Sequence, residues 1–218
     1  MFILSFLWLI GSLPIVTIGA STTAAFDCAF RIIRKRDSRI FTDFVKAYKS
    51  NFKQSTIIFL IMAVIGALLG FDLYFWAQND GGELAFFMNA VSIGIAVIYL
   101  MTLIYVFPVQ AVFENPVKKT IKTAFFMAIG NLPNSFLLVV SVIAISYGCY
   151  LVPEIAYLFF IFGTGTLAMI FSVRLLMVFK KYNPDLAADI AAEAETVEGT
   201  DNEKEYKKKG LFSKKVIK

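Results

Sequence analysis

The chain has 218 residues, 58% of them apolar and 23 of them phenylalanine, and its mean hydropathy is +0.71. Soluble domains are far less apolar, so the composition excludes a soluble globular protein and predicts an integral membrane protein. The formal net charge is +5, but lysine and arginine are confined to segments between apolar runs, which indicates membrane topology and no nucleic-acid partner. Histidine, the commonest general base and metal ligand, does not occur, so we expect no enzymatic activity, cofactor or metal site.

The first apolar segment, residues 2–26, contains no charged residue. At about 1.5 Å per residue it is long enough to cross a hydrocarbon core of about 30 Å, so we expect one membrane span. The span should be kinked at Pro14, which removes a helix hydrogen bond, with Thr17, Ser21 or neighbouring helices covering the freed carbonyls. A cleaved secretory signal peptide is the alternative, but no cationic segment precedes the apolar run and further spans follow.

Two basic amphipathic helices and four further spans are expected along the rest of the chain. The amphipathic helices are expected near 37–54 and 116–130, in the inner headgroup layer, because apolar residues recur there at helical spacing among lysines and arginines. The spans are expected near 55–76, 84–113, 134–152 and 155–179. We therefore predict that residues 1–181 form an all-α, polytopic membrane helix bundle of about five transmembrane helices and two inner-face helices.

All 21 lysines and arginines fall in segments that this threading assigns to the cytoplasm or at the inner end of the last span. The positive-inside rule then predicts an N-terminus outside and a cytoplasmic C-terminus. Residues 182–218 are interpreted as a disordered cytoplasmic tail, or alternatively as a tail whose basic end contacts anionic lipid or its own acidic part. Cys28 and Cys149 are assigned to opposite faces, so we expect two small core residues and no disulfide.

Charged residues of the apolar segments lie near the ends of their spans. Asp27 precedes Arg31 by one helical turn and lies at a depth similar to that of Arg174. We therefore expect an inner-face ion pair between Asp27 and one of these two arginines, with a coupling or gating role as the alternative.

Small residues suggest where helices pack closely. Gly66 and Gly70 form a GxxxG pattern in the second span. The first span carries small residues at four-residue spacing: Gly19, Ala20, Thr23 and Ala24. We interpret both patterns as contacts between the first two spans, with a homodimer face as the alternative.

A shift of 80 residues superimposes two sets of polar residues, Asn51, Gln54 and Ser55 on Asn131, Asn134 and Ser135. Each set stands between an inner-face helix and an apolar span. The match is interpreted as a parallel internal repeat, of the kind known in transporters, or as coincidence.

Three segments carry a family resemblance: LPIVTIGASTTAAF at 13–26, FTDFVKAYKSNFKQST at 41–56 and NPVKKTIKTAFFMAIGNLPNS at 115–135. They resemble the YesL family of bacterial membrane proteins, domain of unknown function 624. The most specific motif residues are Leu13, Pro14, Thr17, Gly19, Thr22 and Ala24. The resemblance covers most of the membrane region and implies a multi-pass protein of the bacterial cell membrane, without an agreed biochemical activity. Since family members usually have a polar leader before this motif, we expect a shortened chain or a start further upstream.

The resemblance also implies a setting, because family members are often encoded beside carbohydrate-uptake transporters and sensor systems. The leading hypothesis is a non-enzymatic accessory component of carbohydrate uptake, whose basic inner helices dock transporter subunits or a sensor kinase, with membrane lipid around it. The alternative is a small secondary transporter or permease for a neutral solute. An intramembrane enzyme is disfavoured, since no paired carboxylates share one depth.

Overall fold

The computed structural model describes residues 2–34, 39–78, 82–113, 115–152 and 163–182. Over these residues it contains seven α-helices, a short 3₁₀ turn and no strand, so the predicted all-α membrane helix bundle is confirmed. Four helical segments are long and apolar enough to cross a membrane: Ile15–Ile33, Ile40–Gln78, Gly82–Val112 and Leu132–Leu151. The predicted tail, except Tyr182, lies outside the described residues.

The first apolar segment is broken into separate helices, so the prediction of one kinked span over 2–26 is wrong. Helix α1 covers Phe2–Gly11, and after the break the 3₁₀ turn η1, Ile15–Thr17, leads into α2, Ile18–Ile33. Pro14 lacks an N–H and its backbone is extended (φ −76°, ψ 118°), which ends the helix. As expected, Thr17 Oγ1 donates hydrogen bonds to carbonyl oxygens at the break, those of Gly11 and Pro14, both at 2.7 Å.

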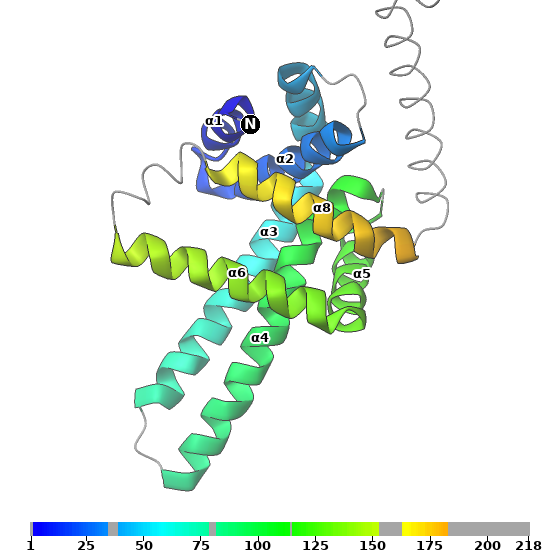
Figure 1. The fold of residues 1–218 in the computed structure, drawn as a ribbon. Coiled ribbons are helices and arrows are strands. Elements are labelled where there is room, and N and C mark those ends of the chain that lie inside the picture. The colour runs from blue at the N-terminus through cyan, green and yellow to red at the C-terminus, as the bar shows by residue number, and fades with distance from the viewer. Residues whose placement is uncertain (1, 35–38, 79–81, 114, 153–162, 183–218) are drawn as a thin grey trace, which may run out of the picture.

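Helices α3 and α4 form a long antiparallel hairpin (Figure 1). Helix α3 runs over Ile40–Gln78 without interruption, so the amphipathic helix expected near 37–54 and the span expected near 55–76 are one helix of 39 residues. No glycine or proline stands at the expected boundary, and a change from an amphipathic to an apolar pattern does not alter helical backbone geometry. Helix α4 covers Gly82–Val112. It begins at Gly82, whose φ of +64° lies in the left-handed region that glycine adopts without steric cost.

The remaining helices are α5, Val117–Gly130, α6, Leu132–Leu151, and α8, Thr164–Tyr182. Asn131, at φ −132° and ψ 48°, separates α5 from α6. Both α6 and α8 cross the hairpin, whose far half projects beyond the other helices (Figure 1). The last expected span, 155–179, overlaps α8, but its first residues lie outside the described part of the chain.

Helix α2 packs along the basic half of α3 through its small residues. A methyl group at Gly19 would lie 2.6 Å from the carbonyl oxygen of Ser55 and 2.7 Å from Cβ of Phe59. Next to it, the buried hydroxyls of Thr23 and Ser55 share a hydrogen bond of 2.9 Å. At the other end of α2, Cys28 Sγ lies 3.9 Å from the carbonyl oxygen of Ile40.

The glycines of the second predicted span do not contact the first, which corrects the expected GxxxG contact. Gly66 faces Tyr99 of α4, whose hydroxyl lies 2.6 Å from the position of an added Cβ, and no atom lies within 4 Å of such a position at Gly70. The reason is the register of α2, whose N-terminal end already lies at Ser55 and Phe59. Helix α2 therefore does not extend along α3 as far as Gly66.

Large apolar side chains cover much of the exposed surface of the hairpin. Leu68 and Phe71 of α3 are 65% and 69% exposed, and Phe86 of α4 is 79% exposed. Such a surface would drive a soluble protein to associate, whereas lipid tails cover it at no cost.

Candidate functional site: a polar cleft at the cationic end

Helix ends that carry lysine and arginine meet at one end of the molecule. The ring of Phe179 on α8 lies 6.0 Å from that of Phe30 on α2 and 5.6 Å from that of Phe113, next to the end of α4. Asn131 Nδ2 donates to Tyr182 Oη at 3.0 Å, which brings the start of α6 to the end of α8.

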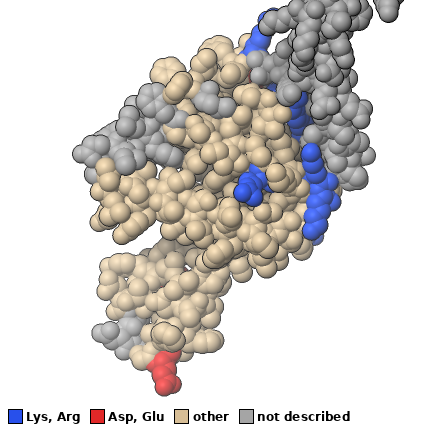
Figure 2. Space-filling view, viewed as in Figure 1, with Lys and Arg blue, Asp and Glu red and all other residues tan. Residues whose placement is uncertain are grey.

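We call the region around these helix ends the cationic end. Its described basic residues are Arg31, Arg34, Arg39, Lys46, Lys49, Lys53, Lys118, Lys119, Lys122, Arg174, Lys180 and Lys181. In Figure 2 basic side chains lie along one side of the molecule, whereas the visible acidic side chain is at the tip of the projecting hairpin.

An open polar cleft of about 710 Å³ lies at the cationic end, between α2, the basic half of α3, the end of α4 and the start of α5. Its polar side chains are Asp27, Arg31, Lys46, Ser50, Asn51, Gln54, Gln110 and Asn115. Apolar residues such as Phe113 and Val117 complete the wall. Small-molecule sites of proteins typically have this size, but this cleft is lined more by polar than by apolar side chains.

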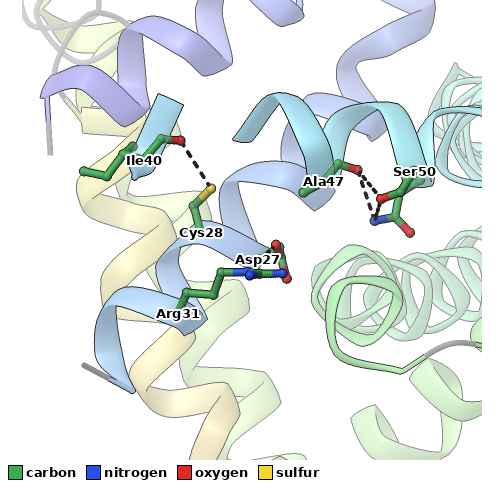
Figure 3. Close-up of polar contacts among 7 residues, drawn as sticks. Asp27, Cys28, Arg31, Ile40, Ala47 and Ser50 are labelled. Carbon is green, nitrogen blue, oxygen red and sulfur yellow. Dashed lines mark hydrogen bonds and ion pairs between the residues drawn. The ribbon is translucent and has the colours of Figure 1, made fainter. Parts of the chain in front are cut away.

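Asp27 and Arg31 form an ion pair at the side of the cleft, with Arg31 Nε 2.9 Å from Asp27 Oδ2. Both side chains project from α2 toward the part of α3 that carries Ala47 and Ser50 (Figure 3). The side chain of Asp27 is 18% exposed and that of Arg31 is 40% exposed, so the pair remains in contact with solvent or headgroups. Of the two pairings expected, the structure contains this one; Arg174 is exposed on α8, and no ion pair joins it to Asp27 in the described residues.

A network of amide and hydroxyl groups joins three helices beside the cleft. Gln110 of α4 is only 5% exposed. Its Nε2 donates to Asn51 Oδ1 at 3.4 Å, and its Oε1 accepts from Thr120 Oγ1 of α5 at 2.9 Å. Gln54 Nε2 donates to the backbone oxygen of Asn115. The network holds the ends of α4 and α5 on α3, so the cleft is a preformed feature of the fold.

The two sets of the suspected repeat have similar side-chain contacts in different backbones. Asn51 and Asn131 each donate to the carbonyl oxygen four residues earlier, at 3.1 Å, and Ser55 and Ser135 are both fully buried. Asn51 lies inside α3, however, whereas Asn131 separates two helices, and Asn134 follows it in the first turn of α6. The repeat stays a prediction.

The family-motif residues lie at the helix break and on the packing face of α2. Leu13 is exposed at the break, and Gly19 and Ala24 are buried. Thr22 Oγ1 accepts a hydrogen bond from Trp8 Nε1 at 3.2 Å, which joins α1 to α2. The motif thus forms the helix break and the packing of α2, and it contributes no side chain to the lining of the cleft.

Sequence reasoning missed Gln110 and Thr120. A signal was present for Gln110, since a glutamine two residues after Pro108 near the end of an apolar span is costly unless it is paired. In the described part of the chain, no group of three cysteine, aspartate or glutamate side chains could hold a metal ion. Cys28 is buried and Cys149 is half-buried, and both are free thiols.

The fold and the cleft define a class: an all-helical membrane protein with a preformed polar cleft at its cationic end. The family model "Protein of unknown function, DUF624" matches residues 1–73. The chain is 26% identical over 165 residues to "Uncharacterized protein YesL" of Bacillus subtilis (strain 168), a match that covers 74% of this chain and 76% of that protein. Both matches confirm the predicted resemblance to the YesL-like DUF624 proteins. No solved structure matches this chain.

Proposed function

We propose that this protein is a non-enzymatic accessory component of the bacterial cell membrane that docks a cytoplasmic partner through its cationic end. The observation that carries the proposal is the gathering of exposed lysines from separate helices at that end, among them Lys49 and Lys53 of α3 and Lys118 and Lys119 of α5. A surface of one sign attracts an acidic partner and raises its rate of association. The positive-inside rule would orient this end toward the cytoplasm, together with the C-terminus.

We further propose that the partner belongs to a carbohydrate-uptake system, as a transporter subunit or a sensor kinase. The resemblance to YesL-like proteins supports this choice, because such proteins are often encoded beside these systems. The cationic end supports a docking role, and the identity of the partner comes from the resemblance alone.

The test is photo-cross-linking in the native bacterial membrane. A cross-linking amino acid replaces Lys119 of the cationic end, and in a matched control it replaces Phe86, which is 79% exposed on the far half of the hairpin. We expect transporter subunits or a sensor kinase to be captured from position 119 and absent from position 86. Repeated capture of lipid alone at both positions would contradict the proposal.

A permease for a neutral solute is the second candidate, and the polar cleft is the observation that favours it. In the described residues no charged side chain is buried, which agrees with a neutral solute and not with proton coupling. This candidate predicts uptake of a radiolabelled neutral sugar into vesicles that contain only this protein. Uptake equal to that of protein-free vesicles would dismiss it.

A further inference from the structure

We propose that the polar cleft is a binding site for a phosphorylated polyol, a phosphate ester with neighbouring hydroxyl groups. Arg31 and Lys46 bind the phosphate, and Asp27 and Gln54 accept hydrogen bonds from the hydroxyls. The site shares Lys46 with the cationic end, but binding of this ligand does not depend on the docking role proposed for that end.

The shape and support of the cleft suit a small molecule. Its volume of about 710 Å³ falls within the range of about 300–1,000 Å³ typical of small-molecule sites. The hydrogen bonds of Gln110 to Asn51 and Thr120 hold its walls, so that binding does not require the helices to rearrange.

The charges of the cleft favour an anionic group. Arg31 and Lys46 contribute two positive charges to the lining against the single carboxylate of Asp27. The ion pair with Asp27 joins Nε of Arg31, so the two terminal nitrogens of the guanidinium lie outside that contact. Arginine and lysine donors of this kind bind phosphate through short, charge-assisted hydrogen bonds.

The acceptors of the cleft require a ligand that also donates hydrogen bonds. Asp27 Oδ1 lies outside the ion pair, which uses Oδ2, and Gln54 uses its Nε2 for the Asn115 carbonyl, which leaves its Oε1 outside that bond. A carboxylate beside a bound phosphate is repulsive, and hydroxyl groups that donate hydrogen bonds to the carboxylate offset part of that cost. Hydroxyls attached to the phosphate ester satisfy both acceptors.

This chemistry has two sources at a membrane surface, a soluble sugar or glycerol phosphate and the headgroup of phosphatidylglycerol. The full-length protein in phosphatidylcholine nanodiscs is titrated calorimetrically with glucose 6-phosphate and glycerol 3-phosphate, and with glucose and inorganic phosphate as component controls. In the lipid arm, native mass spectrometry counts phosphatidylglycerol retained from mixed nanodiscs. Binding in the first arm identifies a soluble ligand, and selective retention in the second identifies the lipid.

The variants compare two exposed lysines of the same helix. Lys46→Gln removes a cation from the cleft, and we expect it to weaken binding at least about tenfold. Lys49→Gln makes the same charge change outside the lining and should leave binding within about twofold. Lys46→Arg keeps the charge and should retain binding. Retained binding in this variant, with an unchanged unfolding midpoint in Lys46→Gln, separates loss of the site from loss of the fold.

Three outcomes would overturn the proposal. Absence of binding in both arms removes the site. An equal loss in Lys46→Gln and Lys49→Gln shows diffuse attraction to the cationic end. If inorganic phosphate binds as tightly as the phosphorylated polyols, the hydroxyl groups have no role in binding. If they do have a role, Asp27→Asn should reduce the preference for the polyols over inorganic phosphate.

Discussion

At Gly19 the backbone of α2 passes so close to α3 that a methyl group has no room. The nearest neighbours are a backbone oxygen and the Cβ of Phe59, which cannot rotate away as the end of a long side chain would. Gly70, in contrast, faces open space on α3. The packing of the helices thus requires a glycine at position 19 and does not require one at position 70, although both glycines belong to small-residue patterns.

We predict that Gly19→Ala destabilises the protein by about 1–3 kcal/mol, because the methyl group forces α2 and α3 apart. Gly70→Ala should leave stability unchanged or raise it by up to about 1 kcal/mol through helix propensity. Thermal unfolding of both variants in the same detergent checks the pair. Equal unfolding midpoints would contradict the observed packing of α2 on α3.

Between elements, single buried hydrogen bonds join helices that cross. Tyr105 of α4 is fully buried, and its hydroxyl lies 3.1 Å from Ser135 Oγ of α6, which donates to it. In the far half of the hairpin, the Asp72 carboxylate of α3 accepts hydrogen bonds from Ser92 of α4 and from Trp76, one turn further along α3, the latter at 3.1 Å. These contacts set which helices pair, since apolar faces alone do not choose partners within lipid.

Tyr105→Phe should lower the free energy of unfolding by about 0.5–1.5 kcal/mol, because it removes the bond to α6 and keeps the ring. Tyr147→Phe is the matched control, since Tyr147 is 62% exposed on α6. Chemical unfolding monitored by fluorescence measures both. If Tyr147→Phe is as destabilised as Tyr105→Phe, the loss of stability does not come from the hydrogen bond between Tyr105 and Ser135.

The continuity of α3 is a second property at this scale, and spin labels test it. Labels at Phe41 and Phe71, both exposed, are 30 positions apart and should be separated by about 45 Å along one straight helix. The labels require prior replacement of Cys28 and Cys149 by alanine. A pair at Leu84 and Ile98 of α4 calibrates the expected distance per residue. A markedly shorter distance on α3 alone would indicate a break near the expected boundary.

Over the whole molecule, charge separates along the hairpin, with lysines of α3 at one end and Glu83 near the opposite tip. The expectation of an N-terminus outside rests on one span over 2–26. The 10 residues of α1 make only about 15 Å of helix, which is too short to cross the hydrocarbon core, and the first segment long enough to cross is Ile15–Ile33. Helix α1 instead contacts the basic half of α3, where Tyr48 Oη donates to the carbonyl oxygen of Gly11 at 3.4 Å.

We predict that single cysteines at Lys119 and Glu83 react from opposite sides of the membrane. A membrane-impermeant maleimide should label position 83 in intact cells and position 119 only after the cytoplasm is opened. The background again lacks Cys28 and Cys149. Labelling of both positions in intact cells would contradict the proposed orientation of the cationic end.

The amino-acid sequence by itself determined the helical class, the apolar segments, a disturbance of the helix at Pro14 and the positions of the basic residues, because these are local properties or simple counts along the chain. The tertiary structure decided which residues meet. Gly19 faces Ser55 and not Gly66, and Gln110 joins Asn51 to Thr120, through contacts that depend on how helices cross. Hydrophobic periodicity specifies an apolar face without naming the helix that covers it, so the polar cleft appeared only in the folded chain.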